Sequence, residues 1–168
     1  MAKLLTPITQ FCGIPNLGSL QKIEYVPISY IYKASFEPII NPATYNWQQE
    51  IRFLRGGWMT MPVLHEKRRW EEKGNRNTQG PYYEQLVNGV VPALRPEVSG
   101  EFDRMAHLRY LLRLTDKKGK VWLLGDLDHP FQFRVIGTTG NKASDLNNYA
   151  IRFYSKTPHK MTGYVPVI

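Results

Sequence analysis

The residues best suited to bind a metal ion lie close together after a predicted strand. Asp126, Asp128 and His129 fall within four positions, and carboxylate oxygens and imidazole nitrogens are common metal ligands. The segment lacks the glycine-containing pattern of a calcium loop, and no second pair of ligands can be assigned to it. We therefore interpret it as a solvated loop before Pro130 and expect no metal and no other cofactor.

Catalytic motifs are not found in the sequence. Cys12 lacks the local signature of a nucleophile, and neither G-x-S-x-G nor H-E-x-x-H occurs. His65 and His107 have charged neighbours but belong to no such motif. The Gly-Thr-Thr-Gly string at 137–140 is not followed by the Gly-Lys-Ser/Thr of a phosphate loop. We expect no catalytic residue and no small-molecule substrate, and a hydrolase is the third of three functions considered.

A basic stretch with a tryptophan inside it is the best candidate for a binding surface. Cations can contact phosphates, and an indole can stack on a base. Three glutamates in the same stretch cancel part of the charge, so the alternative interpretation is a charged strand end followed by a solvated loop. The residues that we expect to contact DNA or an acidic neighbouring protein are Lys67, Arg68, Arg69, Trp70, Lys73 and Arg76.

Length and composition predict a single folded domain over residues 1–168. Hydrophobic residues make up 42% of the chain and aromatic residues 12%, enough for one core. The 22 lysines and arginines exceed the 14 aspartates and glutamates, and the formal net charge of +8 favours an anionic partner. Cys12 is the only cysteine, which predicts a reducing compartment and no internal disulfide. No segment approaches the roughly 18–20 apolar residues of a membrane span, so we expect a soluble protein without membrane contact or secretion signal.

Alternating polarity in the N-terminal part predicts strands and a long excursion. Residues 20–26 alternate and end before Pro27, and a second extended segment is expected through Tyr32. Between about 33 and 57, prolines remove backbone hydrogen-bond donors and restrict the backbone conformation of the residues before them. We predict a long loop there.

The middle of the chain is expected to contain two strands on either side of a second loop. A strand is predicted to begin at Trp58, and a polar loop to follow at about 70–80. Residues 82–91 are predicted to return as a strand. Asn88-Gly89 within it favours either a tight hairpin turn or a bulge.

One helix and one β-hairpin are predicted next. Apolar residues recur at a spacing of three or four between 96 and 112, which is typical of a helix. Residues 110–114 and 121–124 then flank a turn from Asp116 to Gly119, in which aspartate suits the first position and glycine the left-handed last one.

The C-terminal part completes an antiparallel β fold. Residues 131–135 and 149–153 alternate on either side of a glycine- and asparagine-containing loop. Strands at near-even spacing with a single helix predict an α+β, mainly β domain, an antiparallel sandwich or barrel. The aromatic residues that we expect to include the main core contributors are Trp58, Trp122, Phe131, Phe133, Tyr149 and Phe153.

Strings of residues at both ends of the chain carry a resemblance to known proteins. The C-terminal strings are Asp116–Gly125, Pro130–Phe133 and Asp145–Tyr149 with Ile151 and Phe153; the N-terminal ones are Cys12–Gly18 and Ile23, Tyr25, Val26 and Pro27. This pattern resembles that of small structural proteins of tailed bacteriophages and prophages of gut anaerobes. Together they cover about a third of the chain. Asn148 stands where the pattern usually has glycine, and residues 33–100 match no part of it.

The resemblance implies a tail tube, tail terminator or neck ring component, whose small β domains form rings around the DNA channel. It implies a virion protein made in the host cytoplasm that contacts copies of itself and other virion proteins, close to DNA. From the residues alone, aromatic strands and long loops favour head-to-tail contacts that close into rings. The second function considered is a monomeric, basic nucleic-acid-binding module.

Overall fold

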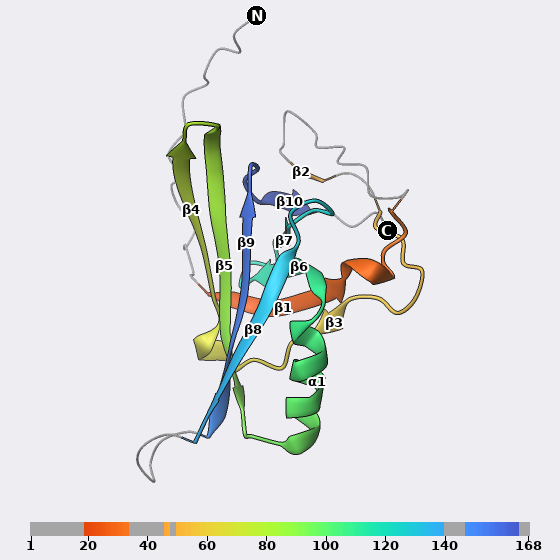
Figure 1. The fold of residues 1–168 in the computed structure, drawn as a ribbon, viewed down its shortest axis with the longest axis vertical. Coiled ribbons are helices and arrows are strands. Elements are labelled where there is room, and N and C mark those ends of the chain that lie inside the picture. Colours follow the sequence, from red (N-terminus) through yellow and green to blue (C-terminus); the bar gives the residue numbers. More distant parts are fainter. Residues whose placement is uncertain (1–18, 34–45, 48–49, 140–146, 165–168) are drawn as a thin grey trace, which may run out of the picture.

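The computed structural model describes residues 19–33, 46–47, 50–139 and 147–164. Within these ranges the protein is mostly antiparallel β-sheet with one α-helix (Figure 1). This confirms the predicted α+β, mainly β class. The sheet does not close on itself, because its strand order runs from β2 to β4 without joining the two ends.

The sheet has the order β2-β10-β7-β6-β8-β9-β5-β4, and β1 pairs with both β6 and β3 outside this path. Among the described strands, the only parallel pairing is that of β10 with β2. The strands are β1 (Leu20–Pro27), β2 (Asn46–Trp47), β3 (Met59–Thr60), β4 (Arg69–Asn77), β5 (Gly80–Pro92), β6 (Arg109–Asp116), β7 (Val121–Leu124), β8 (Phe131–Thr138), β9 (Asn148–Thr157) and β10 (Thr162–Tyr164).

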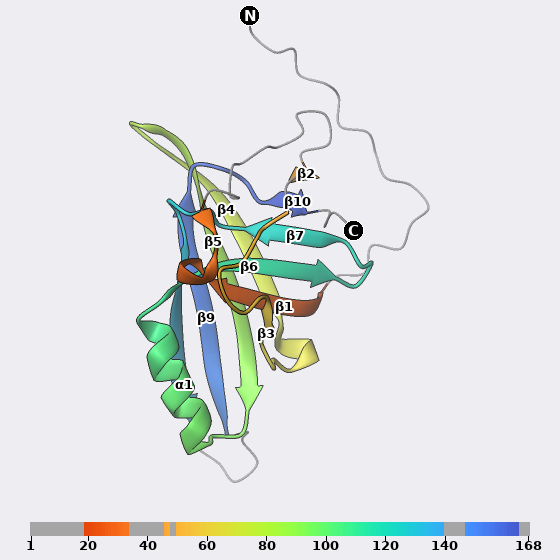
Figure 2. The same cartoon turned by 90° about the vertical axis from the view of Figure 1, so that its right-hand side faces the viewer.

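The strands form two layers that cross each other. β4, β5, β9 and β8 run along the long axis of the molecule, while β1, β6 and β7 cross behind them (Figures 1 and 2). The layers join where β6 meets β8, through the two pairs Arg109–Gln132 and Tyr110–Phe131. The helix α1 (Pro96–Ala106) packs beside β8. The first layer therefore has one face toward the second layer and one face outward.

Aromatic rings fill the space between the layers. Phe153 lies with its ring centroid 5.0 Å from that of Phe133 and 5.7 Å from that of Tyr110, and edge-on and tilted ring contacts of this kind add to the gain from burial. From α1, Phe102 reaches the same cluster, 5.5 Å from Phe133. Of the six predicted core aromatics, Phe131, Phe133, Tyr149 and Phe153 are buried, whereas Trp58 and Trp122 are half-buried at the edges of the core.

One buried carboxylate ties β1 to β6. Glu24 is 4% exposed and accepts hydrogen bonds from the Arg113 guanidinium at 2.7 and 2.9 Å. Lys22 adds an ion pair at 2.6 Å. Burial raises the pKa of the Glu24 carboxyl, but the hydrogen bonds and charges of Arg113 and Lys22 outweigh burial, so its pKa lies below the ordinary value.

The predicted β6–β7 hairpin is confirmed. Gly119 has φ of +78°, a conformation that glycine adopts without a Cβ clash. Asp116 closes the turn, because its Oδ1 accepts hydrogen bonds from the backbone N–H groups of Lys118 at 2.8 Å and Lys120 at 2.9 Å.

Two predictions in the N-terminal part are wrong. The segment after β1 is a 3-10 helix over Ile28–Tyr30, not an extended strand. The strand expected from Trp58 is limited to β3, and a second 3-10 helix, His65–Lys67, precedes β4. Much of the loop predicted at 33–57 lies outside the described residues; residues 50–57 hold one isolated bridge, between Ile31 and Phe53.

The loop predicted at about 70–80 is also wrong, because these residues form a long β-hairpin from β4 and β5. β4 is polar because it is an edge strand and mostly exposed. Neither a turn nor a bulge occurs at Asn88-Gly89, since the register of β5 continues without a shift through both residues. Gly89 is needed for a close approach: a Cβ there would lie 2.6 Å from a methyl group of Val63.

The helix is shorter than predicted. It ends at Ala106, and Leu112, expected on its apolar face, lies in β6. The consecutive residues Tyr110, Leu111 and Leu112 are all buried, because this part of β6 is covered on both faces, and such a run cannot be distinguished from a helix by periodicity alone. The described part of the chain contains no helix long and apolar enough to cross a membrane.

Candidate interaction surface

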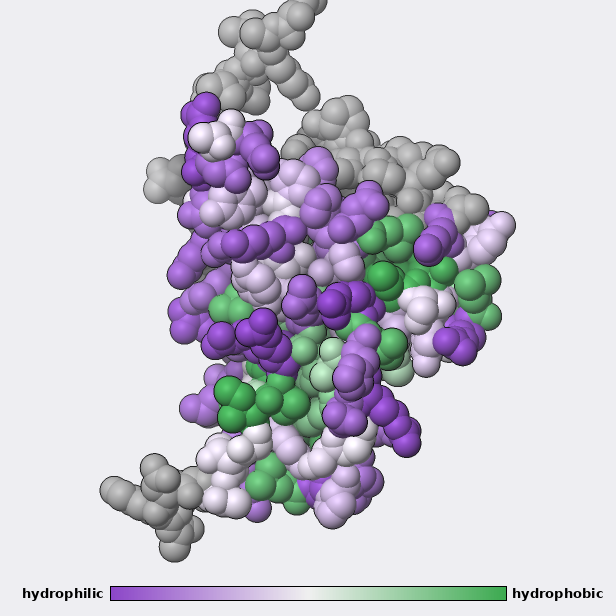
Figure 3. Space-filling model, viewed as in Figure 1, coloured by the Kyte–Doolittle hydropathy of each residue, from purple (hydrophilic) through white to green (hydrophobic). Residues whose placement is uncertain are grey.

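The outward face of the β4–β5–β9–β8 layer gathers charged side chains from four strands. Because side chains alternate along a strand, the same strands that bury Val87, Ile151 and Phe153 turn their other residues outward. Figure 3 shows hydrophilic residues over much of this side of the molecule. We call this surface the outer face, and it consists of Arg69, Glu71, Lys73, Glu84, Leu86, Asn88, Gln132, Arg134, Arg152, Tyr154 and Lys156.

Three arginines form one row across the outer face. The strand register places Arg69 opposite Asn88, Asn88 opposite Arg152, and Arg152 opposite Arg134. Neighbouring strands lie about 4.8 Å apart, so the row crosses all four strands. Arg152 donates a hydrogen bond to the Asn88 side-chain oxygen at 3.3 Å. The row thus consists of three cations and one neutral amide.

A second charged row lies four residues further along the strands. Here Lys73, Glu84 and Lys156 are opposite one another on β4, β5 and β9. Lys156 is 3.1 Å from Glu84, and the hydrogen bond to this carboxylate raises the pKa of the lysine. Between the rows, Glu71 forms an ion pair with Arg69. Both acidic residues of the outer face are therefore already paired.

A shallow hollow of about 260 Å³ opens between the two rows. Tyr154 and Leu86 form its half-buried floor, opposite each other on β9 and β5. The charged residues that line it are Glu71, Lys73, Glu84, Arg134 and Arg152. The hollow therefore has carboxylates toward β4 and β5 and two arginines toward β8 and β9.

The six residues expected from the sequence to form a binding surface do not lie together. Arg69 and Lys73 belong to the outer face, whereas Arg76, an odd number of residues further along β4, belongs to the opposite face of the strand. Lys67 is exposed in the 3-10 helix before β4. The structure thus places two of the six on a shared surface.

The side chains of Arg68 and Trp70 are held by contacts within the fold and do not belong to the outer face. The Arg68 guanidinium donates hydrogen bonds to the backbone carbonyl of Val63, at 2.8 and 3.1 Å, and to that of Gln21. Trp70 packs against the main core cluster from the inward side of β4. Its indole Nε1 is buried without a hydrogen-bond partner among the described residues. Both side chains connect the start of β4 and the residue before it to the rest of the fold.

Sequence reasoning missed the three cations contributed by β8 and β9. Arg134, Arg152 and Lys156 are far from the basic stretch in sequence, and each stands alone between apolar or neutral neighbours. The signal was available in the alternation of these strands, because the residues out of phase with Phe133 and Phe153 must point away from the core. The strand order that brings them beside β4 cannot be read from alternation.

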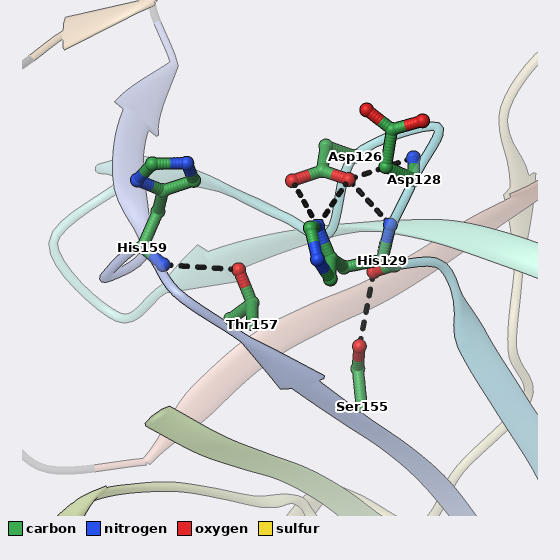
Figure 4. Close-up of polar contacts among 6 residues, drawn as sticks. All are labelled: Asp126, Asp128, His129, Ser155, Thr157 and His159. Atoms are coloured by element: carbon green, nitrogen blue, oxygen red, sulfur yellow. Dashed lines mark hydrogen bonds and ion pairs between the residues drawn. The ribbon is translucent and has the colours of Figure 1, made fainter. Parts of the chain in front are cut away.

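The segment Asp126–His129 forms a self-contained turn (Figure 4). Asp126 Oδ1 accepts hydrogen bonds from the backbone N–H groups of Asp128 and His129, at 2.8 and 2.5 Å. The His129 ring nitrogen Nδ1 lies 3.1 Å from the same oxygen. Ser155 donates to the His129 carbonyl at 3.0 Å and anchors the turn to β9. The contacts are those of an aspartate-capped loop.

A cluster of metal ligands is also absent from the other described segments. Within residues 19–33, 50–139 and 147–164, no three side chains of histidine, cysteine, aspartate or glutamate are grouped so that they could hold a metal ion.

The β4–β5 hairpin projects beyond the sheet. Pairing of β5 with β9 begins at Tyr83, which is opposite Thr157, while pairing of β5 with β4 continues to Asn77 and Gly80. Residues 75–82 therefore form a two-stranded arm, whose tip extends past the other strands (Figure 2). Among the described residues, no strand pairs with the outer edge of β4.

No protein-family model matches this chain, and no curated protein and no solved structure is significantly similar to it.

Proposed function

We propose that this chain is a structural protein without enzymatic activity, and that its copies assemble side by side into a ring in the tail or neck of a tailed bacteriophage. The observation that carries the proposal is the projecting β4–β5 arm, whose outer edge pairs with no described strand. The bacteriophage context is supported by the sequence resemblance at both ends of the chain.

The arm is expected to contribute little to the stability of an isolated monomer. A two-stranded ribbon without further cover is only marginally stable in water. Only the base of the described arm meets the rest of the fold: Tyr82 and the adjacent Tyr83 are half-buried, and their rings are approached by the ammonium groups of Lys156 and Lys160, each at 5.6 Å. Contact with a neighbouring copy would supply the cover that the ribbon lacks.

The edge of β4 is long enough to pair with another strand. It spans nine residues, Arg69–Asn77, more than a typical strand. An unpaired edge exposes backbone donors and acceptors that readily accept a further strand. Charged side chains on β4, among them Glu71, Lys73 and Arg76, disfavour indiscriminate pairing and favour a partner of complementary charge.

A ring requires that the two joined surfaces differ, whereas a two-fold dimer would join β4 to the β4 of a second copy. The other end of the strand order is β2, which differs from β4 in sequence, length and pairing. A contact that joins the β4 end of one copy to a different surface of the next is heterologous, and repeated heterologous contacts close into rings when the rotation permits.

Sedimentation velocity of the full chain tests the proposal. In an arm-shortened variant, Asn75–Tyr82 is replaced by Asn-Gly, so that Gly74 and Tyr83, already opposite each other, are joined by a two-residue turn. We expect the wild-type chain to sediment as an oligomer and the variant as a folded monomer. As a control, Lys117→Ser with Lys118→Ser alters another exposed hairpin turn and should leave the oligomer intact. A wild-type chain that stays monomeric, or a shortened variant that still assembles, would refute the proposal.

A further inference from the structure

The arginine row on the outer face places like charges next to each other, which is unfavourable when no partner covers the surface. Arg134 and Arg152 are directly opposite each other on β8 and β9, and both are exposed. Like charges at directly opposed positions of an antiparallel pair destabilise the sheet. Arg69 continues the row two strands away. The stability of the fold gives no reason for this pairing.

The carboxylates of the outer face are not available to neutralise these arginines. Glu71 is engaged by Arg69, and Glu84 by Lys156. Within the described ranges, the side chains of Arg134 and Lys73 form neither a hydrogen bond nor an ion pair, and Arg152 bonds only to the neutral amide of Asn88. The two carboxylates that line the hollow are thus engaged by Arg69 and Lys156, and the three lining cations Arg134, Arg152 and Lys73 leave it with an excess of positive charge.

The chemistry and spacing of these groups fit a chain of phosphates. The arginine fork matches the geometry of phosphate oxygens and can hold them with two hydrogen bonds. The cations occupy two rows that lie four residues apart, about 14 Å along the strands, which suits a repeating polyanion better than a single small anion. Between the rows, the half-buried ring of Tyr154 offers a surface on which a base or sugar can pack.

We propose that the outer face binds the phosphate backbone of a nucleic acid, with Arg134 and Arg152 as the main contacts, Lys73 at the second row and Tyr154 between them. This inference goes beyond assembly and does not rest on it, because every residue that it uses lies within one copy of the chain. A nucleic acid bound here would lie across β8, β9 and β5, on the side of the molecule seen in Figure 3.

Fluorescence anisotropy with a labelled oligonucleotide of about 20 nucleotides, single-stranded and duplex, tests this across about 50–200 mM salt. The test variant is Arg134→Gln with Arg152→Gln. We expect its affinity to fall on the order of tenfold or more, and its slope of log K against log salt to lose about 1.4 for single strands, since each lost phosphate contact contributes about 0.7.

The matched control removes the same charge elsewhere. Lys117→Gln with Lys118→Gln lowers the formal charge by the same amount at an exposed turn and should bind as the wild-type chain does. Thermal unfolding of both variants supplies a second readout. Without nucleic acid, we expect the arginine variant to melt at a higher temperature than the wild-type chain, because it lacks the opposed like charges.

Four results would overturn the inference. These are a wild-type chain that does not bind either oligonucleotide, an arginine variant that binds as well as the wild type, and a lysine control that weakens binding equally, which would indicate a net-charge effect. The fourth is displacement of the oligonucleotide by polyglutamate at equal charge concentration, which would assign the face to an acidic protein. Oligomer formation is measured separately, so failure here leaves the proposed assembly untouched.

Discussion

The two faces of the β4–β5–β9–β8 layer come from the same strands and have opposite properties. On β9, Ile151 and Phe153 are buried in the core, while Arg152 and Tyr154 between and beyond them belong to the outer face. A shift of one residue in register would exchange the two sets. Residues next to each other in sequence therefore divide into those that specify the fold and those that are available for a partner.

The largest effect on stability is expected when two adjacent residues of β9, one on each face, are substituted in turn. Phe153 is fully buried and contacts three other aromatic rings, so Phe153→Ala should lower the free energy of unfolding by about 3–5 kcal/mol. Tyr154→Ala, one residue away on the outer face, should cost much less. Urea unfolding of both variants measures the difference. Equal losses would show that the register of β9 is wrong.

The next largest effect is expected at Glu24, a buried charge in an interior that is otherwise mostly apolar. Glu24→Gln weakens two hydrogen bonds from Arg113, and we expect a loss of about 1.5–3 kcal/mol at neutral pH. The folded-state pKa of Glu24 is lowered, so its contribution is present above the ordinary pKa and disappears as pH falls through the folded value.

Denaturant unfolding of the wild-type chain and Glu24→Gln at a series of acidic pH values checks this sign. The difference in unfolding free energy should be largest at neutral pH and shrink on acidification. A difference that does not change with pH would mean that the carboxylate charge contributes nothing to the β1–β6 contact.

A glycine on the inward face should respond oppositely to one on the surface. Gly89→Ala places a Cβ 2.6 Å from Val63, and overpacking of this kind costs about 1–3 kcal/mol. Gly100→Ala in α1 meets no atom within 4 Å and should stabilise the helix by about 1 kcal/mol. Thermal melts of the two variants should shift in opposite directions. If Gly89→Ala is neutral, the strand does not approach Val63 so closely.

The smallest of these losses is expected at a turn, away from both faces. Gly119→Val has open space around the new side chain, so its cost comes from the backbone at φ of +78° and should be on the order of 1 kcal/mol or more. Oligonucleotide binding should be unchanged. Unchanged thermal unfolding of the variant would contradict the turn geometry.

Local signals in the sequence predicted part of this fold and failed in identifiable places. The β6–β7 turn and the alternation around Phe133 and Phe153 were readable because one face of each strand is buried and one is not. The edge strand β4 has the composition of a loop, because it is polar along most of its length and gains its structure from pairing with β5. Residues buried on both faces, such as Leu111 and Leu112 in β6, lose the alternation that marks a strand.

The candidate surface was only partly predictable for a different reason. Arg69 and Lys73 lie within a visible basic stretch, but Arg134 and Arg152 come from strands that are about 60 to 80 residues further along the chain. Their proximity depends on the strand order β8-β9-β5-β4, which no local pattern encodes. The sequence alone gave no reason to leave Arg68 out of the candidate binding surface, because its role depends on the carbonyls that it meets in the folded chain.

Hydrogen exchange of the β4 backbone can decide whether copies of the chain join through this edge. Amides on an unpaired edge exchange quickly, and pairing with a neighbouring copy protects them. The exchange of peptides covering Arg69–Asn77 is compared at low and high protein concentration, with the β6–β7 turn around Gly119 as the internal reference. We predict slower exchange in β4 at high concentration and no change at the turn. Exchange in β4 that is independent of concentration while the protein is oligomeric would contradict assembly through this edge.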